Sequence, residues 1–130
     1  MLFVEERKTV CIIDDDPNIL EIYGTKLGNE GFEIITATDG EEGLVIIKSH
    51  CPNIILLDIM MPKKDGIGVL EELKNDTALA KIPVIILSNV SDNEIVKKVG
   101  EFSTHFYIIK SLTTPQKLAG LVKEALANQE

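Results

Sequence analysis

The chain has 130 residues, of which 45% are hydrophobic and 26% are charged, a composition typical of one soluble globular domain. Its formal net charge of −8 argues against direct binding to nucleic acid, because phosphate backbones require clustered Lys and Arg side chains. No apolar run approaches the ~20 residues of a membrane helix, and the few apolar residues before residue 5 are too short for a signal peptide. We therefore expect a cytoplasmic protein that does not enter a membrane.

Five short apolar runs follow a short N-terminal tail, expected over residues 1–8, and they alternate with segments of helical periodicity. The runs, expected to be strands, cover residues 10–13, 33–37, 54–57, 84–87 and 106–109. Most are continuously apolar, which is the mark of strands buried on both faces of a parallel sheet. The run 33–37 is more polar, which suits a position nearer an edge of the sheet.

The segments between the runs carry start signals for helices. Caps or first turns are expected at Asp16-Pro17, at Thr38 to Glu41, at Gly66, at Ser91 or Asp92, and at Thr114-Pro115. Strand–helix units repeated in this way predict an α/β sandwich with right-handed crossovers. The last helix should end close to the end of the sequence, so we expect no output module within these 130 residues.

Polar side chains directly follow four of the five apolar runs. Asp14, Asp15 and Asp16 follow the first run, and Asp58, Ser88 and Lys110 follow the third, fourth and fifth. In open α/β sheets, ligands bind outside the carboxyl ends of the strands. Four such coincidences at one end of a sheet are hard to attribute to chance, so a functional site is expected there.

These segments together resemble the receiver domain of bacterial two-component response regulators. The resemblance rests on the runs Ile12-Ile13-Asp14-Asp15-Asp16-Pro17, Asp58-Ile59-Met60-Met61-Pro62-Lys63-Lys64-Asp65-Gly66, Ser88 and Tyr107-Ile108-Ile109-Lys110, and it covers residues 9–128. It implies a flavodoxin-like doubly wound fold, in which a five-stranded parallel sheet of order 2-1-3-4-5 carries five helices on its two faces.

The resemblance also implies a metal site. Asp14, Asp15 and Asp58 should lie close together, and unit charges 4 Å apart repel by about 4 kcal/mol at an effective dielectric near 20. A divalent cation relieves that repulsion, and oxygen ligands with retained waters suit Mg²⁺, with Mn²⁺ as an alternative. By similarity, Asp15, Asp58 and the backbone carbonyl of Met60 bind the ion directly, and Asp14 acts through water.

The resemblance further implies that Asp58 is a phosphoacceptor. Its carboxylate would attack phosphorus to form an acyl phosphate. The Lys110 ammonium would neutralise charge on the transferring group, and the Ser88 hydroxyl would donate to a phosphoryl oxygen. Tyr107 would then act as a rotameric switch that moves inward as Ser88 shifts towards the phosphoryl group.

A signalling switch is accordingly the expected function, rather than an enzyme acting on other substrates. The phosphoryl donor would be a sensor histidine kinase or a phosphotransfer protein, and output would run through the face formed by the fourth helix, fifth strand and fifth helix. A magnesium phosphatase with an aspartyl nucleophile is an alternative, but Met60 stands where such enzymes typically need a second acid. A receiver-like interaction module that takes no phosphate is the other alternative.

The sequence departs from the family pattern at three places. Ser111 replaces the usual Pro after Lys110, and we expect a trans peptide bond there because a cis bond before a non-proline residue costs about 2.5–4 kcal/mol. Asn89 stands where many relatives have Ala or Gly, which should narrow access to the phosphoryl group. Residues 103–106 lack the acids of many relatives, which weakens the case for a charge-paired dimer.

The remaining reactive side chains are expected to be structural. Cys11 lies in an apolar run, where a free Cys behaves as a small hydrophobe. His50-Cys51 and His105 lack companion ligands at the spacing of a zinc site. Asp16 is expected to be a helix cap rather than a metal ligand.

Overall fold

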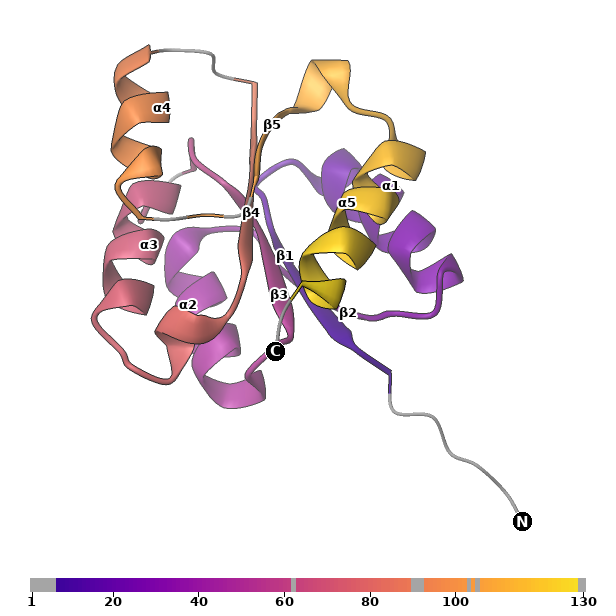
Figure 1. Cartoon of the computed structure of the whole chain (residues 1–130), viewed down its shortest axis with the longest axis horizontal. Coiled ribbons are helices and arrows are strands. Elements are labelled where there is room, and N and C mark those ends of the chain that lie inside the picture. The colour runs from indigo at the N-terminus through magenta and orange to yellow at the C-terminus, as the bar shows by residue number, and fades with distance from the viewer. Residues whose placement is uncertain (1–6, 62, 90–92, 103, 105, 129–130) are drawn as a thin grey trace.

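The computed structural model consists of a central parallel sheet with helices packed on both faces (Figure 1). It describes residues 7–61, 63–89, 93–102, 104 and 106–128. The strands are β1 (Thr9–Ile13), β2 (Glu33–Ala37), β3 (Ile54–Asp58), β4 (Val84–Ser88) and β5 (Phe106–Ile109). The helices are α1 (Pro17–Asn29), α2 (Gly40–His50), α3 (Gly66–Lys74), α4 (Asn93–Gly100) and α5 (Pro115–Ala127), with 3-10 turns η1 (Leu79–Lys81) and η2 (Lys110–Leu112).

The sheet has the order β2-β1-β3-β4-β5, and every pair of neighbouring strands is parallel. The expected doubly wound fold is therefore confirmed. The polar strand β2 lies at an edge, as its composition predicts, and only one of its five residues is buried. All residues of β3 and β4 are buried, which explains why those runs are continuously apolar up to their last position.

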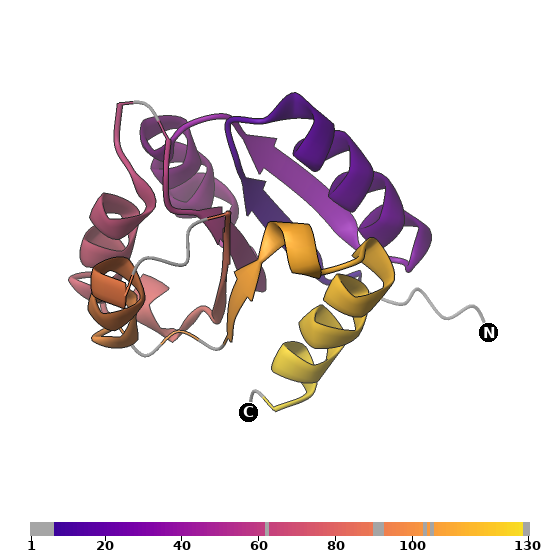
Figure 2. The same cartoon turned by 90° about the horizontal axis from the view of Figure 1, so that it is seen from above.

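Each central strand contributes to two separate cores. Helices α1 and α5 cover one face of the sheet, and α2, α3 and α4 cover the other (Figures 1 and 2). Ile55 and Leu57 pack in the core on the α2–α3–α4 side, and Ile54 and Leu56 pack on the α1–α5 side. Because alternate side chains of a strand point to opposite faces, an unbroken apolar run fills both cores at once.

Side-chain caps fix where the helices begin. The Asp16 carboxylate accepts a hydrogen bond from the Asn18 amide and opens α1, and Thr114 opens α5, each followed by Pro. Within the expected start of α2, the cap is Asp39. Asp65 caps α3 through the Gly68 amide, which the sequence pattern did not single out. The caps expected at Ser91 or Asp92 lie outside the described residues.

No helix in the described part of the chain is long and apolar enough to cross a membrane. The starts of α1, α2, α3 and α5 all follow the carboxyl end of a strand, as the βα units of the fold require. The loops at that edge of the sheet therefore carry the polar residues singled out by the sequence.

Candidate functional site

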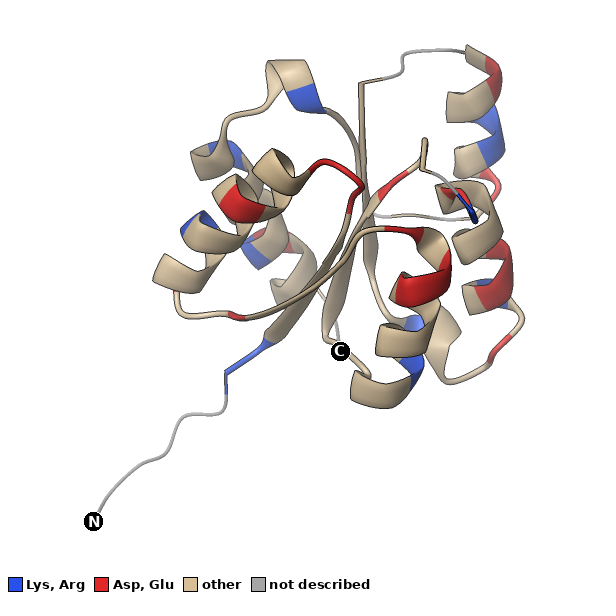
Figure 3. Cartoon of the chain, turned by 180° about the vertical axis from the view of Figure 1, so that it is seen from behind, with Lys and Arg blue, Asp and Glu red and all other residues tan. Residues whose placement is uncertain are grey.

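The carboxyl ends of the strands surround a pocket of about 200 Å³. Asp58 and Ser88 are the last residues of β3 and β4, so each strand extends one residue beyond its apolar run. Asp14 directly follows β1, and Lys110 begins the η2 turn after β5. The residues lining the pocket are Asp15, Asp16, Asp58, Met60, Ser88, Asn89 and Lys110. Figure 3 shows acidic segments gathered at the ends of neighbouring strands on this edge.

Three acidic side chains share this edge of the sheet. Oxygen atoms of Asp14, Asp15 and Asp58 lie within 4.8 Å of one another, the only such group of possible metal ligands among the described residues. Asp14 is fully buried and Asp58 is 4% exposed, whereas Asp15 is exposed. The crowding predicted from the sequence is thus present. Hard carboxylate oxygens on the wall of a pocket that can hold water are the donor set that suits Mg²⁺.

Lys110 neutralises part of this acidic cluster. Its Nζ lies 2.5 Å from Asp14 Oδ2 and 3.4 Å from Asp58 Oδ2. Burial alone would lower the pKa of Lys110, but the hydrogen bonds and negative charges of Asp14 and Asp58 outweigh it and raise the pKa. The ammonium therefore stays charged at neutral pH.

Asp14 is held from both sides and does not line the pocket. Its Oδ1 accepts a hydrogen bond from the Asp16 amide at 2.9 Å, its Oδ2 pairs with Lys110, and its own amide donates to the Ala37 carbonyl at 3.1 Å. The ion pair between Asp14 and Lys110 was not foreseen from the sequence. The pair holds the Lys110 ammonium against a buried carboxylate.

The surroundings of Asp58 oppose the ionisation of its carboxyl group. Burial, followed by the negative charge of Asp14, raises the pKa of Asp58 to about 6, against an opposing effect of Lys110. The carboxylate is still mainly ionised at neutral pH. Its anionic form is nevertheless destabilised, so positive charge brought into the pocket stabilises this residue.

The Lys110–Ser111 peptide bond is trans, as expected, because the structure has no cis peptide bond among the described residues. Ser111 lies in the η2 turn, which is closed by the Thr113 hydroxyl donating to the Ile109 carbonyl at 3.0 Å. The absence of Pro thus leaves Lys110 within ion-pair distance of two acids.

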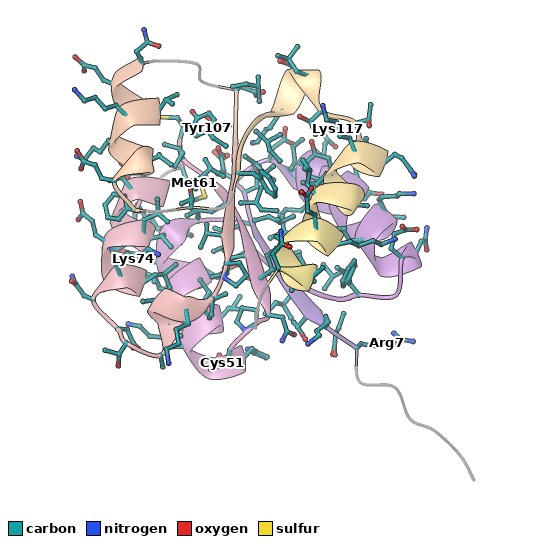
Figure 4. All side chains as sticks on the ribbon, viewed as in Figure 1. Arg7, Cys51, Met61, Lys74, Tyr107 and Lys117 are labelled. Atoms are coloured by element: carbon teal, nitrogen blue, oxygen red, sulfur yellow. The ribbon has the colours of Figure 1, made fainter. Side chains whose placement is uncertain are left out.

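Ser88, Asn89 and Tyr107 occupy different positions around the pocket. Ser88 is fully buried at the pocket wall, and Asn89 is exposed at its lining. Tyr107 is partly buried and packs against the core on the α2–α3–α4 side, to which Met61 also belongs (Figure 4). Tyr107 does not line the pocket.

Cys11, Cys51 and His50 do not line the pocket. Cys11 is buried in β1, and burial raises the pKa of its thiol to about 12. Cys51 ends α2 in a left-handed conformation, with Figure 4 placing it at the end of the molecule away from Tyr107. His50 contacts its own helix through Ser49 and the Ile46 carbonyl. The tail residues 1–6, Pro62, Ser103 and His105 lie outside the described residues.

Comparisons with known proteins agree on one family. The sequence profile of the response regulator receiver domain family matches residues 10–123 of this chain. The chain is 36% identical over 93% of its length to a probable transcriptional regulator ycf27 of Porphyridium aerugineum, covering 49% of that protein. It is 32% identical over 95% of its length to the regulatory protein PhoP of Bacillus subtilis, covering 50% of that protein. The chain thus spans about half the length of these curated relatives.

Solved structures give the same result. A CheY-like response regulator receiver domain protein from Methanospirillum hungatei superimposes with a TM-score of 0.89 at 28% identity, covering 95% of this chain and 97% of that one. The agreement extends over the whole sheet and its helices, because nearly all of both chains is included.

Proposed function

Because this chain belongs to the family of response regulator receiver domains, we propose that it takes a phosphoryl group on the Asp58 carboxylate. The position of Asp58 supports this proposal. This residue ends β3, lines the pocket and lies 3.4 Å from the Lys110 ammonium. Asp14 is committed to its ion pair and lies outside the lining, so it is a poorer nucleophile.

Receiver domains bind Mg²⁺ in an acidic pocket, and the donors of this pocket fit that ion. Asp15, Asp58 and the Met60 carbonyl would hold it directly and Asp14 through water, with Mn²⁺ as a substitute. When bound, the cation supplies positive charge that offsets the crowded carboxylates and the incoming phosphate. The support for this set is that Asp15, Asp58 and Met60 all line the pocket.

The transfer itself is a displacement at phosphorus. An oxygen of Asp58 attacks the phosphoryl group of a phosphohistidine, so that the new O–P bond forms as the N–P bond breaks and the imidazole leaves. The Lys110 ammonium neutralises charge on the transferring group, and the Ser88 hydroxyl donates a hydrogen bond to it. The chain would thus catalyse its own phosphorylation, and hydrolysis of the acyl phosphate would reset it.

The donor in this proposal is a sensor histidine kinase or a phosphotransfer protein in the cytoplasm. Movement of Ser88 towards the phosphoryl group and of Tyr107 inward would alter the face formed by α4, β5 and α5, where an output partner binds. The curated relatives are named as transcriptional regulators, which supports control of transcription as the output. The receiver itself, taken as residues 9–128, would not contact nucleic acid.

Intact-mass measurement tests this function. The protein is incubated with Mg²⁺ and a small phosphodonor such as acetyl phosphate. We expect a gain of one phosphoryl group in the parent, and none in Asp58→Asn or when Mg²⁺ is chelated. An unmodified parent in the presence of Mg²⁺ would contradict the proposal and favour an interaction module that takes no phosphate.

Asn89 should set how long the phosphoryl group survives. Its exposed side chain lines the pocket beside Ser88 and narrows the approach of water to phosphorus. We expect Asn89→Ala to shorten the lifetime about 2- to 10-fold, as a small lowering of the hydrolysis barrier would do. Decay of the phosphorylated mass after removal of the donor measures it, and equal lifetimes would count against this role of Asn89.

A further inference from the structure

The loop between β3 and α3 carries Met60 and is held in place by hydrogen bonds and by packing against the core. The Gly66 amide donates to the Ile59 carbonyl at 2.9 Å and closes the base of the loop. Met61 packs against the core, whereas Met60 is exposed and lines the pocket. A loop fastened in this way can hold the Met60 backbone at a fixed place on the pocket wall.

The first turn of α2 lies against the same loop. The Gly40 amide donates to the Lys64 carbonyl at 3.1 Å. A Cβ atom on residue 40 would lie 2.1 Å from the Lys64 carbonyl oxygen and 2.8 Å from its carbonyl carbon, closer than real Cβ contacts permit. Only glycine allows the helix start and the loop backbone to approach this closely.

An ion pair adds to this contact. Lys63 Nζ lies 3.6 Å from Asp39 Oδ2, and Asp39 also caps α2 through the Glu42 amide. Lys63 has a φ of 65°, a left-handed conformation that costs a non-glycine residue about 1–2 kcal/mol. The lysine side chain is 62% exposed, so the ion pair itself contributes little. The backbone hydrogen bond from Gly40 to Lys64 therefore holds the loop more strongly than the ion pair between Lys63 and Asp39 does.

The connection from β2 to α2 joins both walls of the pocket. At one end, the Ala37 carbonyl accepts from the Asp14 amide, which fixes the wall that follows β1. Three residues later, Gly40 fixes the Lys64 carbonyl in the loop that follows β3. The distance between the acidic wall and the Met60 wall is thus set through this short segment.

We propose that Gly40, supported by Asp39, is a positioning residue that holds the β3–α3 loop and thereby keeps Met60 at the wall of the pocket, where its carbonyl would bind the metal. This inference rests on the metal site of the proposed function. Mg²⁺ demands nearly ideal octahedral geometry, so a displaced carbonyl weakens binding directly. Partners that orient metal ligands typically change affinity by about 10- to 100-fold when they are mutated.

Direct titration of the whole chain with Mg²⁺ by calorimetry tests the inference. Gly40→Ala should bind Mg²⁺ at least about 10-fold more weakly than the parent. Gly120→Ala is the matched control, because Gly120 lies in α5 with nothing within 4 Å of an added Cβ. That variant should bind Mg²⁺ as the parent does. Stability is measured separately without metal, since a purely structural role would lower it while the Mg²⁺ affinity of the folded protein stayed unchanged.

A second variant keeps the test informative if Gly40→Ala does not fold. Asp39→Asn preserves the helix cap, because Asn and Asp cap equally well, and it removes the charge paired with Lys63. We expect about 2- to 5-fold weaker Mg²⁺ binding, the size of an exposed ion pair. Parent-like affinity in the folded variants would overturn the positioning role. A parent that binds no Mg²⁺ would instead contradict the metal site of the proposed function.

Discussion

Replacing Lys110 by Met should lower the free energy of unfolding of the metal-free protein by about 3–5 kcal/mol, the usual cost of removing one partner from a buried ion pair. Asp14 has no exposed surface, and Lys110 is the only cation paired with it among the described residues. The substitution also exposes Asp58 to the full repulsion of its acidic neighbours. The loss should therefore be among the largest of any single substitution in this chain.

Urea denaturation at pH 7 without metal measures this effect. Lys117→Met, at an exposed position of α5, is the matched control and should change the unfolding free energy by less than about 0.5 kcal/mol. Adding Asp14→Asn to Lys110→Met should recover much of the loss, because no buried charge then remains at that position. Similar small losses in both lysine variants would show that Asp14 does not depend on Lys110.

Asp58→Asn should stabilise the metal-free protein at pH 7 by about 1–3 kcal/mol, since one pKa unit corresponds to about 1.36 kcal/mol. The folded state raises the pKa of Asp58 from 3.8 to about 6, chiefly by burial and then by the charge of Asp14. The folded protein therefore holds this proton more tightly than the unfolded chain does. Ionisation between about pH 4 and pH 6 removes stability, and the neutral amide avoids that loss.

The difference in unfolding free energy between Asp58→Asn and the parent should depend on pH. The advantage of Asp58→Asn should be complete well above the folded pKa of about 6 and should disappear as the pH falls below the unfolded value of 3.8, where the parent carboxyl becomes protonated in both states. Thermal or urea unfolding from pH 4 to pH 7.5 measures it. Asp65→Asn is the control, since Asn serves equally as the cap of α3. A parent as stable as Asp58→Asn at pH 7 would mean that the acids are not crowded.

The strands of the sheet are predicted from the apolar runs of the sequence, whereas their order is implied by the resemblance to receiver domains. Continuous apolar runs mark the buried strands, and the more polar run 33–37 lies at the edge as predicted. The sequence predicts β3 and β4 one residue too short at their carboxyl ends, because Asp58 and Ser88 are polar and interrupt the apolar pattern. Both still pair with their neighbouring strands, Asp58 with Leu87 and Ser88 with Ile109.

The partners within the site could not be predicted in the same way. Asp14, Asp15 and Asp58 follow two of the apolar runs, which predicts that they meet at one edge of the sheet, and they do. The ion pair of Lys110 with Asp14 depends on how far a long side chain reaches from the end of β5 across the sheet, which no sequence period encodes. The contact of Gly40 with Lys64 likewise depends on the packing of two loops rather than on a pattern.

Chemical trapping of the phosphorylated residue tests the central claim, that Asp58 is the phosphoacceptor, most directly. The protein is phosphorylated with Mg²⁺ and acetyl phosphate, treated with borohydride, which reduces an aspartyl phosphate to homoserine, and mapped by peptide mass spectrometry. We predict homoserine at position 58, with Asp14 and Asp15 unchanged. Homoserine at either of those positions, or a phosphoryl group that resists reduction on another side chain, would contradict the assignment.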